Sequence, residues 1–162
     1  DLSFQDGTFD SVTSTNVLDY IVDVDSVVAE LRRVLRKGGR FCTISILWDH
    51  HRFHGADPAL NNRILHVFRD HCPHQMLPLG LPKILLNNGF SGITSMPIPI
   101  LNMTMHNNAF ARWTSKTIAA FAIKNGISED EVALWLRQLE EADRGGHFGF
   151  VSISVLTTGV AI

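Results

Sequence analysis

The sequence lacks a long apolar run, a G-x-G-x-x-G motif and any strong excess of charge, and it holds two cysteines in 162 residues. Without an apolar run of roughly 20 residues, we predict no membrane span, and no signal-peptide pattern opens the chain. Cys42 and Cys72 are too few for a disulfide framework, so we expect reduced thiols in a cytoplasmic protein. The net charge of -2 gives no reason to predict nucleic acid as a partner.

The missing glycine motif matters most, because a doubly wound α/β domain usually binds its nucleotide-like ligand on a glycine-rich turn after the first strand. The paired glycines of this sequence, Gly38-Gly39 and Gly145-Gly146, follow helical patterns and precede β-like runs, as helix C-caps do. We therefore expect the sequence to be the carboxyl-terminal part of a larger enzyme, whose cofactor loop precedes Asp1.

What is present is an alternation of strand and helix patterns, and 45% hydrophobic residues suffice for a core. The expected strands span residues 9–14, 41–47, 93–101 and 147–159. The expected helices run from Asp23 or Asp25 to Lys37, with Gly38 as their exit, and over 58–71, 81–88, 110–121 and 128–139. The first strand, helix and second strand predict a parallel right-handed βαβ unit. Pro97 and Pro99 place the third strand at a sheet edge or bend.

The opening third also resembles a known family. The lead-in Asp1-Leu2-Ser3-Phe4, the strand end Ser14-Thr15-Asn16-Val17-Leu18 and the helix and turn Leu31 to Gly39 follow one another as in class I S-adenosylmethionine-dependent methyltransferases. The branch is methyltransferase type 11, which includes the ubiquinone and menaquinone methyltransferases. Ser3 and Lys37 stand where that family has prolines.

This resemblance implies a Rossmann-like α/β sheet with helices on both faces and S-adenosylmethionine as cofactor. Leu2 would lie near the adenine, and Asn16, Val17 and Leu18 would contact the methionine part, mostly through backbone atoms. The resemblance makes residues 1–162 the carboxyl-terminal part of one methyltransferase domain, with a helical substrate-side insertion at 102–146 before the last strand. The acidic residues that bind ribose and adenine in this family would precede Asp1.

The residues that would bind the methyl acceptor are predicted from their position at a strand end. Trp48, Asp49 and His50 come directly after the strand 41–47, at the carboxyl end where an open α/β sheet binds ligands. Asp49 or His50 is a candidate base for an acceptor with an O, N or C nucleophile, and Trp48 is a candidate wall of its pocket. The alternative is that Trp48 lies in the core and Asp49 caps a turn.

Aromatic residues and histidines give weaker signals. Trp113 is a candidate substrate-binding residue, as part of an aromatic set that otherwise indicates helix packing, formed by Phe110, Trp113, Phe121 and Trp135. Two histidine groups lack the C-x-x-C or H-E-x-x-H spacing of zinc sites, so we predict no metal. These groups are His50, His51 and His54, and His66, His71 and His74 with Cys72.

Two other function classes fit the same elements. One is a fragment of an oxidoreductase with a nucleotide cofactor, and the other is a non-catalytic Rossmann-like binding module. The residues upstream of Asp1 would separate these classes, because a glycine-rich turn followed by an acidic residue on the next strand marks a cofactor enzyme. The expected partner of the methyltransferase is a small-molecule methyl acceptor.

Overall fold

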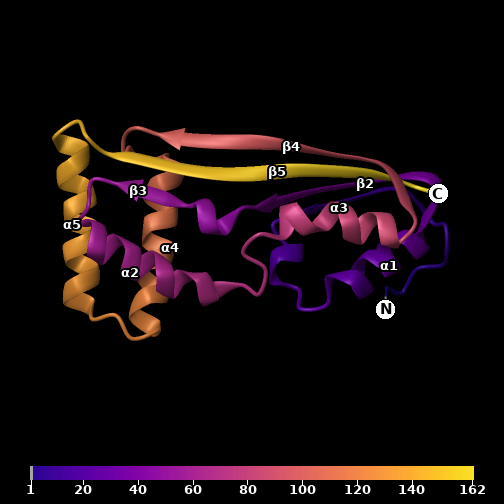
Figure 1. Cartoon of the computed structure of the whole chain (residues 1–162), viewed down its shortest axis with the longest axis horizontal. Helices are drawn as coiled ribbons and strands as arrows, with labels where there is room; N and C mark the ends of the chain where they lie inside the picture. Colours follow the sequence, from indigo (N-terminus) through magenta and orange to yellow (C-terminus); the bar gives the residue numbers. More distant parts are fainter. Residues whose placement is uncertain (1) are drawn as a thin grey trace. The chain divides into compact units, whose positions relative to one another are not determined.

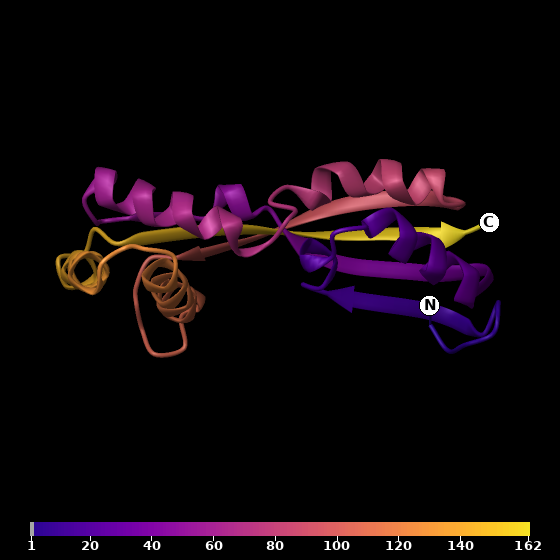
Figure 2. The same cartoon turned by 90° about the horizontal axis from the view of Figure 1, so that it is seen from below.

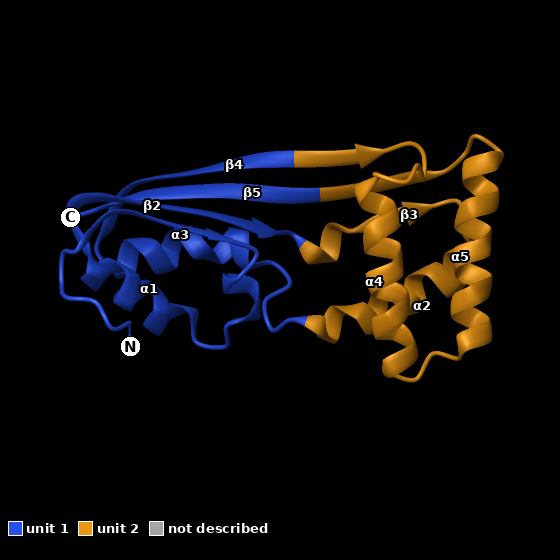
Figure 3. Ribbon diagram, turned by 180° about the vertical axis from the view of Figure 1, so that it is seen from behind, with its two compact units in different colours: residues 1–47, 72–98, 153–162 blue, residues 48–71, 99–152 orange. Residues whose placement is uncertain are grey.

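The computed structural model describes residues 2–162 and divides the chain into two compact units (Figure 3). Unit 1 contains residues 1–47, 72–98 and 153–162, and unit 2 contains residues 48–71 and 99–152. The elements, drawn in Figure 1, are β1 (Phe9–Thr15), η1 (Leu18–Tyr20), α1 (Val24–Val34), β2 (Leu35–Ile46), η2 (Trp48–His50), β3 (Arg52–His54), α2 (Pro58–Phe68), η3 (Arg69–His71), α3 (Leu77–Asn87), β4 (Phe90–Asn102), α4 (Phe110–Lys124), α5 (Glu129–Arg144) and β5 (Gly149–Ala161).

Unit 1 contains the predicted parallel pair. β1 pairs with β2 in parallel, with Val12 opposite Phe41 and Thr15 opposite Ile44. β2 pairs on its other side with β5 in the antiparallel sense, and β4 also pairs with β5. This mixed sheet confirms the predicted α/β class.

One face of these strands carries the core of unit 1. Helices α1 and α3 lie side by side on it, as Figures 1 and 2 show. Phe41 of β2 and Phe90 of β4 are fully buried there, and their rings lie 5.9 Å apart. The helices contribute apolar residues at helical spacing, namely Val24, Val28, Leu77, Leu81 and Leu85.

The end of α1 differs from the prediction. Asp23 caps its start, since its Oδ1 accepts a hydrogen bond from the Ser26 amide at 3.0 Å, but the helix ends at Val34 instead of Lys37. The four residues 36–39 bulge from β2 opposite Asp10, because pairing moves from Phe9 with Leu35 to Ser11 with Arg40. Gly38 has the left-handed φ of 79° in this bulge and not at a helix cap.

Two further elements differ from their predicted bounds. α3 begins at Leu77, four residues before the predicted Leu81, because Pro78 fits the first turn of a helix, where no N–H is required. β4 runs from Phe90 to Asn102 and includes Pro97 and Pro99, both exposed. The predicted strand is therefore confirmed and is longer than expected.

Unit 2 is built around α2, α4, α5 and the short β3, which pairs with the amino-terminal part of β5. Trp135 is fully buried, and its indole N–H donates to Asn61 Oδ1 at 2.9 Å. The capping box predicted at Ser128 and Glu131 is present. No helix among the described residues is both long enough and apolar enough to span a bilayer.

Candidate functional site

The carboxyl end of β1 holds the residues predicted to contact the cofactor. Asn16 has the left-handed φ of 53°, which is uncommon outside glycine and tolerated by asparagine, and its amide donates to the Ile44 carbonyl at 2.8 Å. This turn leaves the Val17 side chain half exposed and buries that of Leu18. The backbone of Asn16 and Val17 therefore follows a strand end, where α/β sheets bind ligands.

The next residue, Asp19, is the unexpected feature of this strand end. Its side chain is fully buried, and neither carboxylate oxygen has a hydrogen bond of normal geometry to a described residue. Burial raises the pKa of Asp19 to about 6, and the nearby Ile46 amide and Ser45 hydroxyl lower it by less. Sequence reasoning stopped at Leu18, although the same rule of strand ends applies to the residue that follows.

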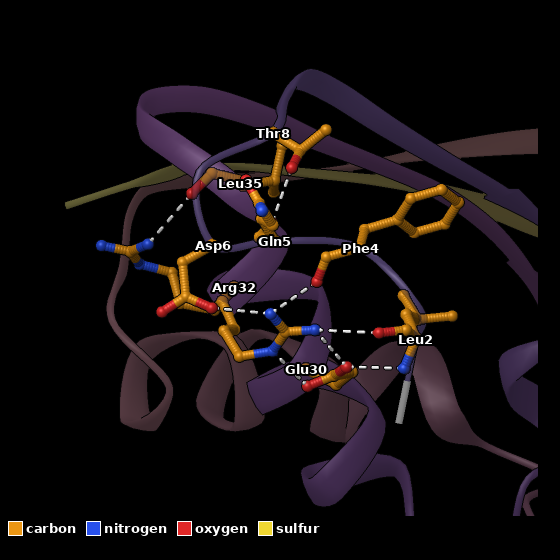
Figure 4. A network of polar contacts seen from close by, with 9 residues as sticks. Leu2, Phe4, Gln5, Asp6, Thr8, Glu30, Arg32 and Leu35 are labelled. Carbon is orange, nitrogen blue, oxygen red and sulfur yellow. Dashed lines mark hydrogen bonds and ion pairs between the residues drawn. The ribbon is translucent and has the colours of Figure 1, made fainter.

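Leu2, the other predicted cofactor contact, lies beside α1. Its amide donates to Glu30 Oε1 at 2.6 Å (Figure 4), and its carbonyl accepts from the Arg33 guanidinium at 3.1 Å. The Arg33 guanidinium, together with the Leu2 amide, lowers the pKa of Glu30 to about 2. The described contacts of Leu2 are thus with α1 and its own lead-in, while Asn16, Val17 and Leu18 follow β1.

In unit 2, the predicted acceptor-side residues form the short helix η2. Asp49 Oδ2 binds the Arg69 guanidinium at 2.7 Å, and His50 is exposed. Trp48 is half-buried, and its ring centroid lies 4.4 Å from that of His71 and 5.0 Å from that of His51. The indole thus packs within unit 2 next to two imidazoles.

His51 is the buried histidine of this group. It is 2% exposed, and neither ring nitrogen has a hydrogen-bond partner among the described residues. Burial, with a smaller contribution from the neighbouring His71, lowers the pKa of His51 to about 4. The ring is therefore neutral at pH 7, and it lies nearly perpendicular to the Phe150 ring at a centroid distance of 5.5 Å.

The aromatic set predicted as a lid or as core contains both exposed and buried side chains. Trp113 of α4 is 63% exposed, and its ring stacks near that of Phe110 at 5.9 Å. Trp135 of α5 belongs to the core of unit 2. Exposure leaves Trp113 free to contact a ligand.

Neither Cys42 nor Cys72 forms a disulfide with a described residue, and Cys72 is buried while Cys42 is partly buried. The described residues contain no group of three or more His, Cys, Asp or Glu side chains arranged to hold a metal ion.

Comparisons with known proteins identify similar sequences and folds. Residues 1–43 match the family model described as "Methyltransferase domain", and this range includes β1, η1 and α1. The match confirms the resemblance to class I methyltransferases. No curated protein matches the sequence.

Solved structures share the fold. The YcgJ protein of Bacillus subtilis has a TM-score of 0.57 and 17% identity, and the protein BH2331 of Bacillus halodurans C-125 has 0.54 and 14%. In both cases the alignment covers 99% of this chain and 67% of the other chain. Phosphoethanolamine N-methyltransferase 2 of Haemonchus contortus has a TM-score of 0.50 and 15% identity, with 98% of this chain and 35% of that enzyme covered. The fold is therefore Rossmann-like, as in class I methyltransferases.

Proposed function

We propose that the protein transfers a methyl group from S-adenosylmethionine to a small-molecule acceptor. One observation carries the proposal: the segment that matches a methyltransferase domain, residues 1–43, contains the strand end at which Asn16 turns the backbone out of β1. The class I fold supports it as well, and so does the Haemonchus contortus enzyme of this fold, whose structure contains S-adenosylhomocysteine.

The residues at the end of β1 fit the cofactor. The exposed residues Asn16 and Val17, next to the buried Leu18, suit the methionine part, and we assign the adenine side to Leu2, which is 40% exposed. When bound, S-adenosylmethionine supplies an electrophilic sulfonium methyl group. The protein's task is to hold the acceptor in line with that methyl group and to exclude water.

On the acceptor side, we assign walls of the pocket to Trp48 and Trp113 and polar contacts to Asp49 and His50. The exposed indole of Trp113 and the partly exposed one of Trp48 offer flat apolar surface. The Arg69 guanidinium holds the Asp49 carboxylate in one orientation, which suits a group that orients a ligand. These assignments favour an acceptor with a flat or apolar body and an O, N or C nucleophile.

A transfer assay tests the function. The intact protein is incubated with S-adenosylmethionine labelled in its methyl group and a panel of phenols, carboxylic acids, alkylamines and phosphorylated amines, including the phosphomonomethylethanolamine present in the Haemonchus contortus enzyme structure. We expect label to appear in one acceptor class and S-adenosylhomocysteine to inhibit the transfer. If the folded protein binds neither S-adenosylmethionine nor S-adenosylhomocysteine, the proposal is contradicted. Binding of a nicotinamide nucleotide instead would indicate the oxidoreductase. Binding of neither S-adenosylmethionine nor a nicotinamide nucleotide would indicate the non-catalytic module.

A further inference from the structure

Asp19 is the one fully buried carboxylate among residues 2–162. Burying a carboxylate without a hydrogen-bonded or charged partner costs several kcal/mol, so folds rarely keep one for stability alone. Such groups gather at functional sites, where an unpaired charge has a task when a ligand arrives. Asp19 directly follows the proposed cofactor contact Leu18, so it lies at the strand end where α/β sheets bind ligands.

The groups around Asp19 come from three elements of unit 1. Ser45, near the end of β2, presents a buried hydroxyl that has no hydrogen-bond partner among the described residues. In the segment before α3, the His74 amide donates to the Asp19 carbonyl at 3.4 Å, and the His74 side chain lowers the pKa of Asp19 slightly. Tyr20 and Cys72 complete the group. Burial is the largest cause of the raised pKa of Tyr20, and the Cys72 thiol and Asp19 raise it further.

None of the groups that act on the Asp19 carboxylate is a lysine or an arginine. Asp49 differs in this respect, because Arg69 already binds it at 2.7 Å. An unneutralised carboxylate at the carboxyl ends of two neighbouring parallel strands is well placed to take up a proton from a ligand bound there.

We propose that Asp19 accepts the proton that the methyl acceptor loses. This role rests on the proposed function. The acceptor's oxygen or nitrogen forms a bond to the methyl carbon, the carbon–sulfur bond breaks with its electron pair going to sulfur, and the O–H or N–H proton passes to an Asp19 carboxylate oxygen. A base that ionises near neutral pH suits this step, and burial holds the pKa of Asp19 at about 6.

Access to Asp19 follows from what covers it. The segment Cys72–Gln75 lies against η1 through the contact of the His74 amide with Asp19, while Gln75 binds the Cys72 carbonyl at 2.9 Å. Asp19 therefore reaches an acceptor when this short segment shifts away from η1. The segment lies between two helical elements, η3 and α3.

The test compares Asp19→Asn with Asp10→Asn, which changes an exposed carboxylate at the start of β1. With labelled S-adenosylmethionine and the acceptor found in the panel, we expect Asp19→Asn to lower kcat by about 100-fold or more and to abolish the acid limb of the pH–rate profile near pH 6. Asp10→Asn should match the wild type. Affinity for S-adenosylhomocysteine should stay within about threefold in both variants.

A second readout does not require turnover. Because Asp19→Asn removes a buried charge without changing shape, it should raise Tm at pH 7 by at least about 4 °C and leave it nearly unchanged at pH 4, where the carboxyl group is already protonated. Asp10→Asn should leave Tm nearly unchanged at both pH values.

Four results would overturn the role of Asp19. They are an unchanged kcat in Asp19→Asn, a loss of S-adenosylhomocysteine binding that accounts for the lower rate, a loss of the acid limb in Asp49→Asn or His50→Gln instead, and an unchanged Tm at pH 7. Failure of the proposed function is a separate result, because there the wild-type protein itself neither binds S-adenosylmethionine nor transfers its methyl group.

Discussion

The buried His51 of unit 2 makes stability depend on pH in a direction that its burial dictates. Its pKa is lowered from 6.5 to about 4, so between these pH values the unfolded chain binds a proton that the folded protein does not. The free energy of unfolding therefore falls as pH drops below 6.5, and the loss is complete below about 4. The loss is on the order of 3 kcal/mol. Asp19 acts oppositely, since its raised pKa removes stability as pH rises through about 6.

We expect His51→Phe to remove this acid sensitivity, because phenylalanine fits among Trp48 and Phe150 without a titratable group. The measurement is urea unfolding of wild type and variant at pH 4.5 and pH 7. Relative to the wild type, the free energy of unfolding of the variant should be higher at pH 4.5 than at pH 7. His54→Gln, at an exposed histidine of β3, is the control and should change nothing. Parallel pH curves for His51→Phe and wild type would mean that the buried ring is protonated without penalty.

At single residues, sequence reasoning named residues that follow strand ends and missed the buried side chains next to them. The rule of strand ends led to Asp49 and His50, whereas the tight turn of η2 points the following His51 into the core. The same rule led to Leu18 and not to Asp19. Which residue of a short turn faces inward depends on the packing around it, and the sequence pattern alone carries no such information.

Among the elements, local signals predicted helix starts better than helix ends. Side chains that bind backbone amides, as Asp23 and Ser128 do, act within three residues and are visible in the sequence. The end of α1 instead depends on pairing between β1 and β2, since Arg36 leaves the helix and binds Asp10 at 2.7 Å. A contact between residues so far apart in the sequence cannot be predicted from the local pattern.

The capping box of α5 provides a prediction at this scale. Ser128→Ala removes the acceptor for the Glu131 amide and should lower the free energy of unfolding by about 1 kcal/mol. Ser128→Asn keeps a side-chain oxygen at the N-cap, so its stability should stay close to that of the wild type. Chemical denaturation of the three proteins measures both effects. Equal losses of stability in Ser128→Ala and Ser128→Asn would show that a side-chain oxygen at the N-cap is not what stabilises α5.

For the whole molecule, the alternating pattern was sufficient to predict an α/β fold, and the mixed sheet and the solved structures of similar fold confirm it. The division into two units was beyond sequence reasoning. Unit 2 joins residues 48–71 to 99–152, so it contains the predicted insertion 102–146 together with a segment that precedes β4. Contacts between α2 and the helices α4 and α5 create this unit, and they link positions far apart in the sequence.

The central proposal is that the end of β1 binds S-adenosylmethionine through its backbone, and the two exposed valines after β1 allow a direct test. Val17 is 50% exposed at the strand end, and Val22 is 82% exposed before α1. Calorimetric titration of the intact protein with S-adenosylmethionine should give clear binding for wild type and Val22→Trp. It should give at least about tenfold weaker binding for Val17→Trp, whose indole would occupy the space above the backbone. Equal affinity in all three proteins, or no binding by the folded wild type, would contradict a cofactor site at this strand end.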